Sequence, residues 1–157
     1  MTKLRTWYVI ALLTCLGSVT LYTQQVAADS FHGATYLITI KDATTGAFAS
    51  RGVITLHGDR TLSAIDSAQG GPAFFFSSQL GAWEPDGERK AVGRTLDFNF
   101  SPNDGVARLD YTFKFSPNSK QVTGSITLTT FPLQEDPLNG EGIVAGEFTF
   151  DGTLVRP

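Results

Sequence analysis

From residue 34 onward, hydrophobic and polar residues alternate with a period of two in successive stretches of the chain. The clearest alternation sets Ala107, Leu109, Tyr111, Phe113 and Phe115 against Arg108, Asp110, Thr112 and Lys114. This pattern is typical of a β-strand with one buried and one solvated face, and no window shows a sustained helical stripe. The alternation therefore predicts an all-β protein.

Turn sequences rich in Gly, Pro, Asn and Asp, such as Gly58-Asp59-Arg60 and Pro85-Asp86-Gly87, separate the alternating stretches. The predicted strands cover residues 34–41, 49–57, 61–66, 74–84, 91–100, 107–115, 122–129 and 143–154. Short connections without crossover helices allow an antiparallel sandwich or an up-and-down barrel. We expect a single antiparallel barrel of about eight strands, because closure removes exposed edge strands. Barrels of this size are filled by their own side chains or hold one small ligand.

The composition agrees with one globular domain of modest negative charge. The 157 residues include 12 basic and 15 acidic side chains, for a formal net charge of -3. A nucleic-acid partner is not expected, because binding a phosphate backbone requires a positive surface. The 16 Gly, 7 Pro and 12 Phe indicate frequent turns and an aromatic core.

The N-terminal segment has the order of a secretory signal peptide. Lys3 and Arg5 precede an apolar run, and the small residues 26–28 precede the first acid, Asp29. We expect cleavage near Ala28, a signal peptide over residues 1–28, a β-barrel domain over 29–157, and export to the periplasm or the medium. The alternative is an uncleaved membrane anchor, but polar and glycine residues dilute the stretch below what a spanning helix needs.

Cys15 offers a second alternative, because residues 12–15 have the outline of a lipoprotein signal with the cysteine as lipid acceptor. The apolar run ahead of it is short, and a better cleavage site follows. If Cys15 leaves with the signal peptide, the mature chain has no cysteine for a disulfide, a thiolate nucleophile or a zinc-thiolate site. No stable membrane insertion is then expected after cleavage.

Two segments carry a family resemblance, namely residues 54–61 and Gly81-Ala82-Trp83-Glu84 followed by Asp86-Gly87. With the Phe-rich strand that follows, they resemble a group of small exported calycin-like proteins described mostly as lipocalin-like. Gly81-Ala82-Trp83 is also similar to the lipocalin Gly-x-Trp motif, which caps one end of the barrel, although in lipocalins it lies on the first strand. The resemblance implies a barrel that binds something hydrophobic. Allene oxide cyclase and dirigent barrels and calycin-like natural-product cyclases share this architecture, and they imply a cofactor-free enzyme as the alternative.

The sequence offers no familiar catalytic or metal-binding motif. His32 and His57 lack carboxylates at a paired spacing, so no metal site is expected. A Gly-x-Ser-x-Gly elbow is absent, and Gly70-Gly71-Pro72 leads into phenylalanines, where a phosphate loop would lead into a helix. We therefore expect no cofactor.

Counting by twos along each strand selects the residues that face the barrel interior. The expected cavity-lining residues are Tyr36, Trp83, Phe98, Phe100, Tyr111, Phe113, Phe148 and Phe150. Three consecutive aromatics, Phe74, Phe75 and Phe76, cannot all face one side of a strand. They form either an apolar lip at the entrance of the cavity or ordinary packing under the preceding loop.

Arg94 falls in line with Leu96, Phe98 and Phe100, on the face expected to be buried. A buried arginine needs a carboxylate, and Asp66 is the predicted partner. Alternatively, a bulge at Gly93 turns Arg94 into solvent. The same register predicts solvated positions for Asp97, Arg108, Asp110 and Glu147.

Three functions follow from these observations. The leading one is the binding of a small hydrophobic molecule. The second is a cofactor-free cyclase or isomerase, with Tyr111, Tyr36, Arg94 and Asp66 as candidate catalytic residues. The third is a packed structural or inhibitory module whose loop over residues 133–142 contacts another protein. The sequence leaves the oligomeric state open.

Overall fold

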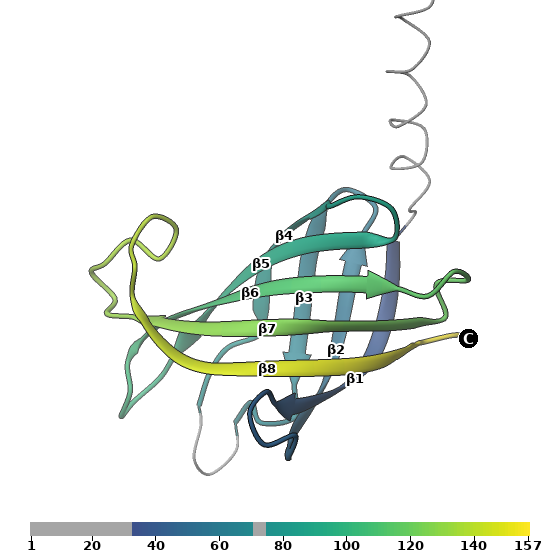
Figure 1. The fold of residues 1–157 in the computed structure, drawn as a ribbon. Helices are drawn as coiled ribbons and strands as arrows, with labels where there is room; N and C mark the ends of the chain where they lie inside the picture. Colours follow the sequence, from purple (N-terminus) through teal and green to yellow (C-terminus); the bar gives the residue numbers. More distant parts are fainter. Residues whose placement is uncertain (1–32, 71–74) are drawn as a thin grey trace, which may run out of the picture. The chain divides into compact units, whose positions relative to one another are not determined.

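The computed structural model of the chain describes residues 33–70 and 75–157. Within these residues, eight antiparallel strands pair in chain order, and β8 pairs with β1 to close a barrel (Figure 1). The predicted all-β, up-and-down barrel is thereby confirmed. The expected signal peptide with Cys15, together with His32 and Phe74, lies outside the described residues.

Most of the observed strands begin and end within a few residues of the predicted bounds. The strands are β1 (Gly33–Asp42), β2 (Phe48–His57), β3 (Thr61–Asp66), β4 (Gln79–Pro85), β5 (Lys90–Asn99), β6 (Gly105–Phe115), β7 (Gln121–Phe131) and β8 (Ile143–Leu154). The main difference is the start of β4, which was predicted at residue 74. Phe76 makes only an isolated bridge to Asn99, and the Ser77 hydroxyl accepts the Phe98 N–H at 3.0 Å. The Ser77 N–H also donates to the Phe98 oxygen at 2.9 Å, and the Phe100 N–H donates to the Phe75 oxygen at 2.8 Å. This stretch therefore pairs with the end of β5 without forming a regular strand.

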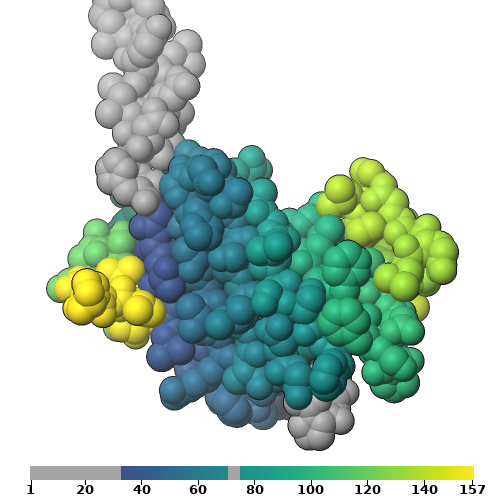
Figure 2. Space-filling view, turned by 180° about the vertical axis from the view of Figure 1, so that it is seen from behind, coloured from purple at the N-terminus to yellow at the C-terminus, as the bar shows by residue number. Residues whose placement is uncertain are grey.

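Up-and-down strands place their connections alternately at two ends of the barrel. The end with the β2–β3 hairpin, here named the closed end, holds Trp83, which is buried. The Trp83 indole nitrogen donates to the His57 carbonyl oxygen at 2.9 Å, and the Arg60 guanidinium covers the ring. The opposite end, here named the open end, carries the β1–β2, β3–β4, β5–β6 and β7–β8 connections. The β7–β8 connection projects from the barrel wall in both views (Figure 1, Figure 2).

The closed half of the barrel is filled by aromatic side chains. Phe113 stacks between Tyr111 and Phe115, with ring centroids 5.6 and 6.2 Å away, and Phe150 meets Phe113 edge-on at 5.7 Å. Tyr36 packs 6.0 Å from Phe115. Such offset and edge-on contacts are the arrangements that aromatic rings prefer. This half of the interior is a packed core.

The predicted register of β5 was wrong. Thr95 and Asp97 are buried, at 0% and 4% exposure, whereas Phe98 and Phe100 are 56% and 48% exposed. The reason lies in the pairing with β6, where Leu109 is opposite Thr95. Directly paired residues share a face, so the inward Leu109 turns Thr95 and Asp97 inward as well.

Arg94 is exposed, as in the second of the two alternatives, so the predicted Arg94–Asp66 pair does not form. Its exposure follows from the register of β5, which pairs with β6 without a bulge at Gly93. Arg94 lies on the outer face, where its Nε donates to Asp110 at 2.6 Å. Asp66 instead accepts the Ser50 hydroxyl at 2.9 Å and the Ala68 N–H at 2.7 Å.

Of the four residues predicted to be solvated, Asp97 is buried and Arg108 is largely covered. The Arg108 Nη1 donates to the carbonyl oxygens of Pro137 and Gly140, at 2.8 and 3.2 Å. Its guanidinium also lies 5.0 Å from the centre of the Phe131 ring. Arg108 therefore fixes the β7–β8 connection against the barrel wall.

Candidate functional site

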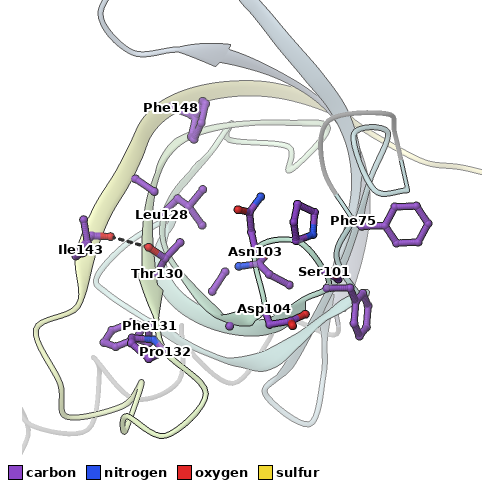
Figure 3. Close-up of a pocket in the computed structure, with 16 residues that line it drawn as sticks. Phe75, Ser101, Asn103, Asp104, Leu128, Thr130, Phe131, Pro132, Ile143 and Phe148 are labelled. Carbon is purple, nitrogen blue, oxygen red and sulfur yellow. Dashed lines mark hydrogen bonds between the residues drawn. The ribbon is translucent and has the colours of Figure 1, made fainter.

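A cavity of about 690 Å³ occupies the open end of the barrel. Its wall is formed by inward residues of three adjacent strands, Ala107 on β6, Leu128 on β7 and Phe148 on β8. The β5–β6 turn contributes Asn103, whose side chain lies over the middle of the barrel mouth (Figure 3). The cavity thus has mostly apolar walls and polar side chains at its mouth, among them Asn103 and the carboxylate of Asp104.

The structure separates the predicted lining residues into three groups. Phe148 and Phe100 line the cavity, as does Phe75 from the predicted lip. Phe98 faces solvent on the outside of the barrel. The others lie in the core or at the closed end, outside the cavity lining: Tyr36, Trp83, Tyr111, Phe113 and Phe150.

Phe75 is 61% exposed and lies at the rim, with its ring directed away from the mouth (Figure 3). Phe76 is half-buried and pairs with Asn99. The role of these two residues as an apolar lip stays a prediction.

A group of polar side chains inside the barrel lies next to the cavity. Its members, here named the interior polar cluster, are Asp66, Gln79, Thr95, Asp97 and Tyr111. The Tyr111 hydroxyl donates to Gln79 Oε1 at 2.5 Å, and the Thr95 hydroxyl donates to the same oxygen at 3.4 Å. Burial raises the pKa of Tyr111, and the nearby carboxyls of Asp66 and Asp97 add to the rise. Tyr111 is consequently a neutral hydrogen-bond donor.

Asp97 is the least satisfied member of this cluster. Its Oδ1 atom is buried and has no hydrogen-bond partner among the residues that the structure describes. Removal from water disfavours the charged form and raises the pKa of Asp97 to about 7. Asp97 therefore changes charge near neutral pH.

The strand pairing places Asp97 next to the inner end of the cavity. Its partner on β6 is Ala107, which lines the cavity, and Asn99, two residues further along the same face of β5, lines it too. On the other side, Thr95 lies two residues earlier on the same face of β5 and hydrogen-bonds to Gln79. Asp97 does not itself line the cavity, and its carboxyl lies in the barrel interior next to the lining residues Ala107 and Asn99.

Sequence reasoning missed Asp97, Gln79 and Thr95 as interior groups. No local signal marked them, because Gly93 is placed on the inward face only by its pairing with Tyr111 on β6. Counting by twos from Gly93 places Thr95 and Asp97 on the same inward face. The prediction instead assigned the larger apolar residues of β5 to the interior.

The described residues contain no group of three or more His, Cys, Asp or Glu placed to hold a metal ion. Over the same residues, no helix is long and apolar enough to cross a membrane. Comparison with protein-family models, curated proteins and solved structures gave no match to this chain.

Proposed function

We propose that this barrel binds a small hydrophobic molecule in the cavity at its open end. The observation that carries the proposal is an apolar-walled cavity of about 690 Å³ in a barrel whose other half is packed. Ligand sites of small molecules are commonly about 300–1,000 Å³, mostly apolar, with a few polar groups that orient the ligand. The volume and the apolar walls fit this description.

Native mass spectrometry of the protein purified from its own host tests the proposal. We expect a retained mass of a few hundred daltons that disappears when the protein unfolds. The same spectrum gives the N-terminus of the chain and thereby tests cleavage near Ala28. If the spectrum shows only the mass of the protein, and the dye-binding assay described next shows no binding, the packed structural or inhibitory module is favoured.

A cavity-filling variant gives a second, independent test with a neutral probe. Leu128→Trp places an indole in the cavity, whereas Thr123→Trp adds the same group to the exposed side of the same strand. We expect Nile red fluorescence to rise with the wild-type protein and Thr123→Trp. Affinity should fall at least about tenfold in Leu128→Trp, which corresponds to about 1.4 kcal/mol of lost contacts. Equal affinity of both variants would contradict binding in this cavity.

A cofactor-free cyclase or isomerase is the second candidate function. It is favoured by the buried carboxyl of Asp97 and the neutral phenol of Tyr111, which share the interior next to the cavity. Arg94 and Asp66 do not form the polarising pair that was expected. If the molecule released from the protein is a product, turnover of its precursor should fall in Tyr111→Phe. Unchanged turnover would remove Tyr111 from the mechanism.

A further inference from the structure

We propose that the ligand is an apolar molecule carrying a protonated amine, and that Asp97 binds this group at the base of the cavity. The inference rests on the proposed function and specifies the chemical class of its ligand. It is drawn from the unsatisfied oxygen of Asp97, the charges inside the barrel and the position of Asp97 beside the cavity.

The hydroxyl groups of the interior polar cluster are already engaged with another acceptor. Tyr111 and Thr95 both donate to Gln79 Oε1. Asp97 Oδ1 therefore receives no hydrogen bond from the described residues, although it is buried. A buried carboxyl oxygen without a donor is costly, so a donor supplied by the ligand is favourable.

The charges inside the barrel decide which donor fits best. The carboxyls that face the interior are Asp66 and Asp97, and the described inward positions of the eight strands include no Lys, Arg or His. Arg60 lies over Trp83 at the closed end, and Arg108 lies outside the barrel beneath the β7–β8 connection. An ammonium group would supply both the missing donor and the missing positive charge.

The same arrangement disfavours the other common head groups of small apolar ligands. A carboxylate would face Asp97 and Asp66 without a cation to pair with, so like charges would repel in a poorly solvated site. A hydroxyl would satisfy one lone pair of Asp97 but would leave its charge uncompensated. The expected order of affinity is therefore amine, alcohol and carboxylate.

Three probes of equal chain length test this order: decylamine, 1-decanol and decanoate. Their affinities are measured by Nile red displacement on the full protein at pH 8, where Asp97 is ionised and the amine is protonated. We expect decylamine to bind at least about tenfold more tightly than decanoate, the effect of one favourable ion pair of about 1.4 kcal/mol. In Asp97→Asn this preference should fall to about twofold or less, as expected when the charge is removed but the shape is kept.

Asp151→Asn is the matched control, because Asp151 is exposed and pairs with Lys41 on the outer surface. It should keep the wild-type preference. Asp97→Leu is a second variant of similar volume, and it removes the buried charge without leaving an unpaired amide. It should lose the preference as Asp97→Asn does.

The outcomes distinguish this inference from the proposed function. If the three probes bind with equal affinity and all bind more weakly to Leu128→Trp, the proposal of a hydrophobic binding cavity stands. The inference that the ligand carries an amine is then overturned. Tighter binding of decanoate, or an amine preference that survives in both Asp97 variants, would overturn it as well. Failure of all three probes and of Nile red to bind would overturn both proposals.

Discussion

The guanidinium carbon of Arg60 lies 4.5 Å from the centre of the Trp83 ring, and the indole N–H of Trp83 donates to the His57 carbonyl at 2.9 Å. One aromatic side chain of β4 is thereby fixed to both sides of the β2–β3 turn. These contacts pack Trp83 against the β2–β3 turn at the end of the barrel opposite the cavity.

Replacing Trp83 with Ala should destabilise the protein by about 3–5 kcal/mol, because it removes a buried aromatic side chain and its hydrogen bond. Urea unfolding followed by circular dichroism measures this change. Leu80→Ala is the control, since Leu80 lies on the same strand but is 67% exposed. It should change stability by less than about 0.5 kcal/mol. Equal effects of the two variants would show that Trp83 is not a structural cap.

Asp97 should make the protein more stable as the pH falls from about 7 toward 4. Its pKa is higher in the folded state than in the unfolded chain, so the folded state binds more protons in this range. Above pH 7 the ionised carboxyl lowers stability by roughly 4 kcal/mol, the energetic equivalent of a pKa difference of about three. Denaturant unfolding at a series of pH values measures the slope.

The groups that face Asp97 come from three other strands: Asp66 on β3, Gln79 on β4, and Ala107 and Tyr111 on β6. The pKa of Tyr111 is raised above its ordinary value, so it remains neutral over this range. Asp97→Asn should therefore remove most of the slope and should be more stable than the wild type at pH 8. A slope that persists in Asp97→Asn would assign the titration to another group.

Tyr111→Phe should lower stability by about 1–3 kcal/mol, because Gln79 then loses its shorter hydrogen bond inside the barrel. Tyr36→Phe provides a comparison, since the Tyr36 hydroxyl donates at 3.0 Å to the Ser119 carbonyl at a partly buried position. Its cost should be about 0.5–1.5 kcal/mol. A neutral Tyr111→Phe would show that Gln79 finds another donor, and it would weaken the case for a fixed interior polar cluster.

The strands could be predicted from sequence because alternation and turn residues act locally. The face of β5 could not, because Leu96 and Phe98 are large and apolar while the residues that alternate with them, Thr95, Asp97 and Asn99, are polar. The pairing of Gly93 with Tyr111 and of Thr95 with Leu109 overrides that local pattern. Phe98 is left on the surface, and Asp97 is left in the interior.

The location of the cavity also could not be predicted from local sequence patterns. It depends on the β5–β6 turn with Asn103 and on how far the strands extend past the aromatic core. Among the predicted aromatic lining residues on the strands, only Phe148 both faces inward and lies far enough toward the open end to contribute to its wall. The sequence thus predicted the type of protein, but it did not place the base of the site.

Gly81 offers a last test, because its position opposite Thr95 ties the interior polar cluster to the close approach of β4 and β5. A Cβ atom at Gly81 would lie 1.9 Å from the Arg94 carbonyl oxygen and 2.7 Å from the Thr95 Cα. Both contacts are with backbone, so a rotamer change cannot relieve them. Gly81→Ala should therefore push the two strands apart and cost about 1–3 kcal/mol, as overpacking in a tight site does.

The separation should also weaken Nile red binding, since Thr95 and Gln79 lie beside the base of the cavity. Ala82→Ser is the control, because residue 82 is exposed on the neighbouring position of the same strand. It should leave both stability and binding unchanged. If Gly81→Ala were as stable as Ala82→Ser, the strands would have room for a side chain, and the glycine would not be required for this packing. If it were unstable but bound the dye normally, the cavity would not depend on the position of Thr95.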